Sequence, residues 1–277
     1  GKLLFILATP AIIAQLVNVL YNIVDRIFIG RLPEGDLAMA GIGVAFPIIM
    51  LISATSALIG MGGAPLAAIK MGEQDHDGAE KIMSNALSML VILSILLMMS
   101  LLIFKEPLLL AFGASSQTLV YANDYLGIYI LGTLFVQIAI GMNPFINTQG
   151  FAKIGMMTVM VGAVVNIILD PIFIFGLNLG VKGAAFATVI SQFISALWTL
   201  RFLTGKKTIL KIKKQYLSLK VKYVTKIISL GMAGFMMAIT NSIVTIVCNA
   251  TLQQYGGDLY IAIMTIINSI REVASLP

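Results

Sequence analysis

The sequence predicts an all-α integral membrane protein, with a six-helix N-lobe bundle followed by the start of a second, pseudo-symmetric six-helix bundle. Of its 277 residues, 59% are hydrophobic and only 11% are charged, against about 25% charged in an ordinary soluble domain. Uncharged apolar runs reach the roughly 20 residues that cross a bilayer as a helix. A weak internal repeat relates the first of these runs to the seventh. Together these observations exclude a soluble globule, a disordered chain and a disulfide-built secreted module.

Seven complete apolar runs follow one another, and an eighth begins. The first extends from Leu3 to Gly30, and it is too long, and too polar near Asp25, to be a cleaved signal peptide. Charged residues separate the runs because an ionised side chain is costly inside the bilayer. The later runs are Leu37–Ile69, Ile82–Phe104, Tyr125–Ala152, Ile154–Phe175, Gly183–Leu203, Ile227–Tyr255 and an eighth that begins at Leu259 and continues to Pro277.

A basic segment divides the chain after the sixth run. Nine Lys or Arg residues and no Asp or Glu lie between Arg201 and Lys226, which predicts a cytoplasmic linker by the positive-inside rule. Six crossings precede it, so the N-terminus is predicted to be cytoplasmic as well. We therefore divide the chain into an N-lobe (1–205), a linker (206–223) and the start of a C-lobe (224–277). The net charge of +6 is interpreted as this topology signal, with binding of anionic lipids or a regulatory ligand as the alternative.

The internal repeat supports two lobes. A shift of 222 positions superposes Gly35-Asp36-Leu37-x-x-Ala40 on Gly257-Asp258-Leu259-x-x-Ala262. The seventh run is therefore predicted to be a second copy of the first, in two bundles related by an axis along the membrane normal. By the same logic we expect a chain truncated after the start of its eighth span, with roughly 170 residues to follow.

Enzyme chemistry is not indicated. One Cys (Cys248) and one His (His76) provide neither a thiolate zinc site nor a His-rich metal site. Gly60-Met61-Gly62-Gly63 lacks the Lys-Ser/Thr of a phosphate-binding loop, and the common hydrolase motifs do not occur. We predict a protein that is not an enzyme and has no cofactor.

Two acidic residues lie inside the apolar runs. Asn166 and Asp170 are four residues apart, on one face of a helix, and Pro171 follows at once. Because proline donates no backbone hydrogen bond, the carbonyl of Ile167 is expected to be free beside the carboxylate. This arrangement suits a proton or a small hard cation. The alternative is an Asp-Pro pair that ends the helix.

Asp25 lies in a polar stripe of the first run. Asn18, Tyr21 and Asn22 precede it by seven, four and three residues, so they share its helix face. Such a stripe faces protein or water rather than lipid. The alternative for Asp25 is an ion pair with Arg26 or Arg31.

The sequence resembles one known family over its whole length. The stretch from Asn166 through Asp170-Pro171 to Gly176, with Leu179-Gly180-Val181-x-Gly183-Ala184-Ala185-x-Ala187-Thr188, resembles helices 5 and 6 of the multidrug and toxic compound extrusion (MATE) family. Val24-Asp25-x-Ile27-Phe28-Ile29-Gly30 is similar to the end of that family's first helix. The resemblance implies a twelve-helix exporter with a V-shaped pair of lobes, driven by H⁺ or Na⁺.

The resemblance also implies an N-lobe cation site. Its residues would be Asp25, Asn143, Asn166, Asp170 and Thr188, with Tyr21, Asn22 and Tyr125 as neighbours. The 18-residue spacing of Tyr125 and Asn143 corresponds to five helical turns, which places both on one face of a regular helix. The seventh run has no acidic residue, so coupling should depend on the N-lobe.

The function predicted is secondary active efflux of amphipathic organic cations in exchange for H⁺ or Na⁺. The expected protein is a monomer in the cell membrane, surrounded by membrane lipids, with no nucleic-acid partner. Two alternatives remain: a flippase for lipid-linked precursors, which would need a strongly basic cavity, and a non-transporting membrane subunit whose buried acids only pair helices.

Overall fold

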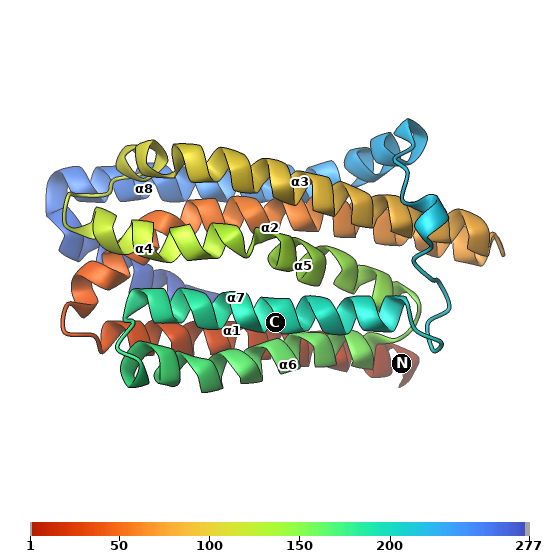
Figure 1. Ribbon diagram of the computed structural model, residues 1–277, viewed down its shortest axis with the longest axis horizontal. Helices are drawn as coiled ribbons and strands as arrows, with labels where there is room; N and C mark the ends of the chain where they lie inside the picture. Colours follow the sequence, from red (N-terminus) through yellow and green to blue (C-terminus); the bar gives the residue numbers. More distant parts are fainter. Residues whose placement is uncertain (1, 275–277) are drawn as a thin grey trace.

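The structure is a computed structural model that describes residues 2–274, with side chains described for residues 9–271 and 274. Its described part is mainly helical, a set of long helices lying side by side (Figure 1). The α-helices are α1 (Lys2–Gly30), α2 (Gly35–Gly72), α3 (His76–Ala111), α4 (Thr118–Leu131), α5 (Thr133–Thr148), α6 (Ala152–Pro171), α7 (Val181–Leu203) and α8 (Val221–Ala274). A π-helix, η1 (Ile172–Gly176), and a 3₁₀ turn, η2 (Lys214–Tyr216), complete the described elements.

The membrane-protein prediction is confirmed. Within residues 2–274, six helices are long and apolar enough to cross a membrane, or seven if the bent pair α4–α5 is counted as one span. The predicted run Tyr125–Ala152 is wrong in detail, because the helix begins at Thr118 and bends by 60° at Gly132. At the bend the backbone lies against α7: a Cβ on Gly132 would be 2.5 Å from Val189 Cγ2.

The predicted seventh and eighth runs form the two arms of α8. Gly257 separates them with φ +68°, a left-handed conformation that favours glycine. Gly35, its counterpart in the repeat, likewise stands where a helix starts. The last predicted residues of the eighth run, 275–277, lie outside the described part, as does residue 1.

The central helix is α2, which packs against α8, α5, α3 and α4 (Figure 1). Two apolar clusters follow its length. One surrounds Ile48 and Ile52 with α4, and the other surrounds Ile59 with Phe145 of α5 and Leu90 of α3. Helices α1 and α6 pack together beside this core, and α7 contacts α4, α5 and α6. The acidic residues of α1 and α6 thus lie at one contact within the bundle.

Candidate functional site

Asp170 lies at the end of α6, and its side chain is completely buried. Asn166 Nδ2, one turn earlier, donates a hydrogen bond of 3.2 Å to Asp170 Oδ1. Asp170 Oδ2 and Asn166 Oδ1 are buried and have no hydrogen-bond partner in the described chain. Beyond Pro171 the helix continues as η1, a π-helix of the kind found often at functional sites. The pair therefore keeps two acceptor oxygens available in the interior.

Asp25 supplies a third such oxygen from α1. Its Oδ1 is buried and has no hydrogen-bond partner among the described residues, and α1 packs against α6, the helix of Asp170. The ion pairs between described side chains do not include Asp25 with Arg26 or Arg31. Arg26 instead lies over the Phe46 ring, 5.3 Å from its centroid, and donates to Ser269 Oγ of α8. Two carboxyl groups thus share one buried region.

A cavity of about 430 Å³ lies beside Asp25. Its wall is partly aromatic: Tyr125 and Tyr129 stack with ring centroids 5.9 Å apart. The lining residues are Asn18, Tyr21, Asn22, Asp25, Arg26, Ile42, Phe46, Ile49, Met50, Ser53, Ala54, Ala57, Tyr125, Tyr129, Ile140, Thr188, Gln192 and Ala238. Asp25 and Arg26 bring opposite charges to a mostly apolar and aromatic surface.

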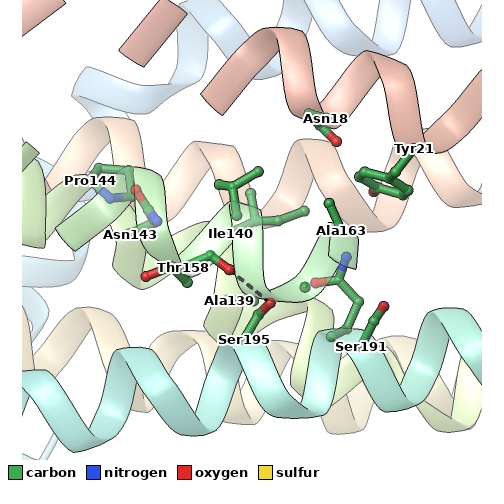
Figure 2. A pocket seen from close by; sticks show the side chains of 13 residues that line it. Asn18, Tyr21, Ala139, Ile140, Asn143, Pro144, Thr158, Ala163, Ser191 and Ser195 are labelled. Carbon is green, nitrogen blue, oxygen red and sulfur yellow. Dashed lines mark hydrogen bonds between the residues drawn. The ribbon is translucent and has the colours of Figure 1, made fainter. Parts of the chain in front are cut away.

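A second cavity of about 280 Å³ adjoins the first and shares Asn18, Tyr21, Ile140 and Gln192 with it. Its lining carries no Asp, Glu, Lys or Arg. Figure 2 shows Asn18 and Tyr21 of α1 on one side and Ser191 and Ser195 of α7 on the other. The Ser195 hydroxyl donates a 3.1 Å bond to the backbone carbonyl of Thr158, which ties α7 to α6. This cavity is therefore uncharged, with hydroxyl and amide groups among apolar lining residues.

The structure brings most of the eight predicted site residues together. Five of them line the larger cavity: Tyr21, Asn22, Asp25, Tyr125 and Thr188. The buried pair Asn166 and Asp170 lines neither cavity.

Asn143 lies apart from the carboxyl pair, in the smaller cavity. Its Nδ2 donates to the Gly155 carbonyl at 2.9 Å, and its Oδ1 accepts a 3.1 Å bond from Asn147. The 60° bend at Gly132 lies between Tyr125 and Asn143, so the two do not share one regular helix face. A role for Asn143 in cation binding stays a prediction.

Sequence reasoning missed several lining residues. Tyr129 follows Tyr125 by four residues, and Gln192 follows Thr188 by four, so helical spacing could have found both. Phe46 and Ser53 of α2, and Ala238 of α8, come from helices that carried no polar signal of their own. The contribution of α8 shows that the cavity wall includes part of the predicted C-lobe.

Comparison with known proteins agrees with this geometry. The MatE family model matches residues 10–172. The multidrug export protein MepA of Staphylococcus haemolyticus (strain JCSC1435) is 30% identical over 247 residues, which cover 89% of this chain and 54% of that protein. MepA of Staphylococcus aureus (strain MSSA476) is 26% identical over the same shares. The chain spans about half the length of the curated relatives it matches.

Solved structures give the same result. The MATE multidrug transporter DinF-BH, solved in complex with a ligand, is 36% identical, with a TM-score of 0.93, over 100% of this chain and 62% of that one. A MOP superfamily transporter from Pyrococcus furiosus, described as having a binding pocket of reverse polarity, is 28% identical, with a TM-score of 0.88. The match covers 100% of this chain and 61% of that one. Because the family model covers more than half of the sequence and the fold agrees with solved members, the chain belongs to the MatE family of membrane transporters.

Proposed function

We propose that the transporter containing this chain exports amphipathic organic cations in exchange for H⁺ or Na⁺. The observation that carries the proposal is the pair Asp25 and Asp170: each has a buried carboxyl oxygen without a hydrogen-bond partner among the described residues, and Asp25 lines a cavity of about 430 Å³. A relative named as a multidrug export protein and a related structure of a MATE multidrug transporter support the same activity.

The cavity chemistry suits an organic cation. Aromatic rings attract cations through their electron-rich faces, and the wall offers the stacked Tyr125 and Tyr129. Asp25 provides the negative charge that a bound cation needs, while Ile42, Ile49 and Met50 provide apolar contact. A cationic, partly apolar molecule of drug size matches this combination.

The coupling ion is proposed to bind between α1 and α6. Asp25 Oδ1, Asn166 Oδ1 and Asp170 Oδ2 are acceptors of the kind that hold a proton or Na⁺. Thr188 and Tyr125 line the same cavity as Asp25 and would orient the site. A membrane potential of 100 mV contributes about 2.3 kcal/mol per charge, so each coupled charge supports a concentration ratio of roughly 50-fold.

A flippase for lipid-linked precursors fits the cavity less well. Such anionic substrates call for a strongly basic wall, yet Arg26 is the only Lys or Arg that lines either large cavity, and Asp25 stands beside it. The pocket of reverse polarity described for the Pyrococcus furiosus relative makes this charge balance the feature to examine.

Transport in proteoliposomes tests the proposal. We expect an imposed H⁺ or Na⁺ gradient to drive a fluorescent organic cation across the membrane in the direction opposite to the ion. A fluorescent anion of equal size should not be transported. Imposing each gradient alone identifies the coupling ion. The proposal fails if neither gradient drives transport of the cation, so that liposomes containing folded transporter take up no more of it than protein-free liposomes.

Cysteine labelling tests the topology. We expect the segment between α7 and α8 and the N-terminus to be cytoplasmic, in a monomer embedded in the cell membrane. In a Cys248→Ala background, Ser218→Cys and Ser116→Cys place thiols at exposed positions near opposite ends of the bundle. An impermeant maleimide added to intact cells should label only position 116. Labelling of position 218 from outside would reverse the assignment.

A further inference from the structure

The two ends of the helix bundle differ in charge. Among the described side chains, twelve Lys or Arg residues face four Asp or Glu residues at the end where α3 begins and α7 stops, while the opposite end has three against five. The twelve are Lys70, Lys81, Lys153 and the nine basic residues from Arg201 to Lys226. The excess positive charge is therefore gathered at one end.

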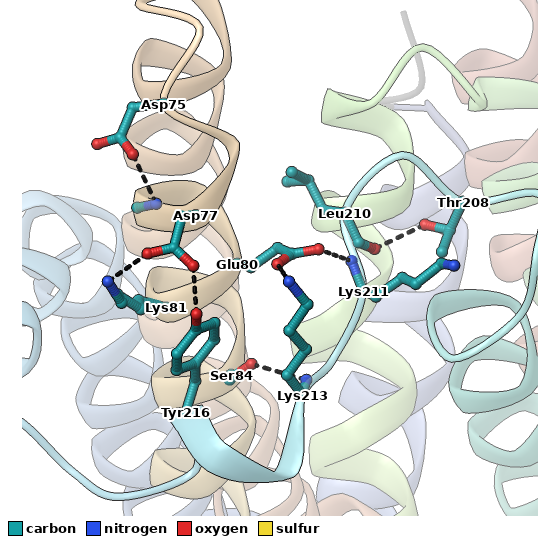
Figure 3. A network of polar contacts seen from close by, with 11 residues as sticks. Asp75, Asp77, Glu80, Lys81, Ser84, Thr208, Leu210, Lys211, Lys213 and Tyr216 are labelled. Atoms are coloured by element: carbon teal, nitrogen blue, oxygen red, sulfur yellow. Dashed lines mark hydrogen bonds and ion pairs between the residues drawn. The ribbon is translucent and has the colours of Figure 1, made fainter.

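The four acids at that end already have partners, and Figure 3 shows Asp75, Asp77 and Glu80 among them. Glu73 and Asp75 both bind Lys70, with N–O distances of 2.7 and 3.3 Å. Hydrogen bonds from a backbone N–H and then from Lys70 lower the pKa of Asp75, so this carboxylate remains charged. Lys81 pairs with Asp77.

The fourth acid, Glu80, binds Lys213. Nine basic residues at this end thus have no ion-pair partner among the described residues, and all nine are exposed. We call them the basic belt: Lys153, Arg201, Lys206, Lys207, Lys211, Lys214, Lys220, Lys222 and Lys226.

Most of the belt is carried on a segment that is anchored to the bundle. We name residues 204–220, between α7 and α8, the strap. Gln149 Oε1, at the end of α5, accepts hydrogen bonds from Thr208 Oγ1 and from the backbone N–H groups of residues 209 and 210, at 2.8 to 2.9 Å.

Helix α3 holds the rest of the strap (Figure 3). Glu80 Oε1 accepts from the Lys211 backbone at 3.1 Å, and Asn85 Oδ1 accepts from the Lys220 backbone at 2.8 Å. The belt lysines therefore extend from a fixed backbone rather than from a free tether.

Apolar side chains alternate with this charge. Ile209 and Leu219 of the strap are 48% and 42% exposed, and Val221 at the start of α8 is 77% exposed. The strap also joins directly to α7 and α8, whose apolar length crosses the membrane. Exposed apolar groups between lysines are typical of segments that lie at the membrane interface, and a solvated linker or a nucleic-acid surface would not need them.

We propose that the basic belt binds the headgroups of anionic phospholipids in the leaflet around this end of the bundle. Unpaired cations attract an anionic lipid surface within about one Debye length. The anchored strap holds the lysines at that surface, and Ile209, Leu219 and Val221 enter the interface beside them.

Trp198 is a built-in reporter for this interaction. It is the only Trp of the 277 residues, is 38% exposed, and lies five residues before the end of α7, or about 7.5 Å along the helix. Brominated lipids quench its fluorescence on contact. In mixed bilayers we expect brominated phosphatidylglycerol to quench about fivefold more effectively, per mole, than brominated phosphatidylcholine, and this preference to weaken in high salt.

Variants that remove or keep the positive charge of the belt test whether the belt causes the preference for anionic lipid. Replacing Lys206, Lys207, Lys211 and Lys214 together by Gln should lower the preference to about onefold or twofold, and replacing the same four by Arg should retain it. One control should leave it unchanged: Lys182→Gln, at the opposite end and paired with Asp124. Equal quenching by the two lipids in the unmodified chain, or loss in the Arg variant as in the Gln variant, would overturn the proposal.

Discussion

We expect Asp170→Asn to reduce gradient-driven export of an organic cation to the level of protein-free liposomes. The change keeps the size of the side chain and its contact with Asn166, but it removes the only acidic group of α6. Without it the site cannot alternate between a cation-loaded and an empty state. The measurement is uptake of a fluorescent cation into inverted vesicles, normalised to folded transporter.

Asp25→Asn should give the same loss, and the double variant should be no worse than either single one. Residues that act as one unit are non-additive, and Asp25 and Asp170 lie on two helices that pack together. Asp124→Asn is the matched control, because Asp124 is partly exposed and bound to Lys182 at 3.3 Å, away from both cavities. It should leave transport unchanged.

A purely structural pair gives a different pattern. If the two acids only hold α1 against α6, their replacement should lower expression and thermal stability, since a buried group left unsatisfied costs about 1–3 kcal/mol. Transport per folded molecule would then be retained. Near-normal transport by one of the two single variants would exclude that residue from the site. Near-normal transport by both single variants would favour the alternative of a non-transporting membrane subunit.

The sequence could predict the carboxyl pair because intramembrane charge is rare and costly. Asp25 and Asp170 were identifiable as interior acids, and helical spacing placed Asn166 beside Asp170, as the hydrogen bond between them confirms. That the acids of α1 and α6 interact followed only from the family resemblance, because no local pattern pairs two helices that are more than 100 residues apart. Spacing rules act within one helix.

Features that depend on packing could not be predicted. The bend at Gly132 has no proline beside it, and it lies where Val189 of another helix packs against the glycine. It separates Asn143 from Tyr125, which a straight helix would have aligned. The anchoring of the strap depends on Gln149 and Glu80, whose partners lie about 60 and 131 residues away.

The largest effect on stability is expected from Gly231→Ala, where α8 touches α2. A Cβ at this position would lie 2.0 Å from the backbone carbonyl oxygen of Leu58, and one at Gly62 would lie 2.1 Å from that of Ile227. These contacts join backbone to backbone, so no side-chain rotation can relieve them. Overpacking typically costs about 1–3 kcal/mol, and we expect the melting temperature in detergent to fall by roughly 10 °C.

Gly234→Ala is the matched control, because it makes the same change three residues further along the same helix. A Cβ there would meet only the flexible side chain of Met61, at 3.9 Å. Alanine is the better helix former by about 1 kcal/mol, so this variant should be as stable as the parent or slightly more stable. Both variants gain the same helix propensity, and the difference between their melting temperatures therefore isolates the α2–α8 contact. If Gly231→Ala and Gly234→Ala have the same melting temperature, α8 does not meet α2 at Leu58. The part of the larger cavity's wall that α8 provides through Ala238 would then be misplaced as well.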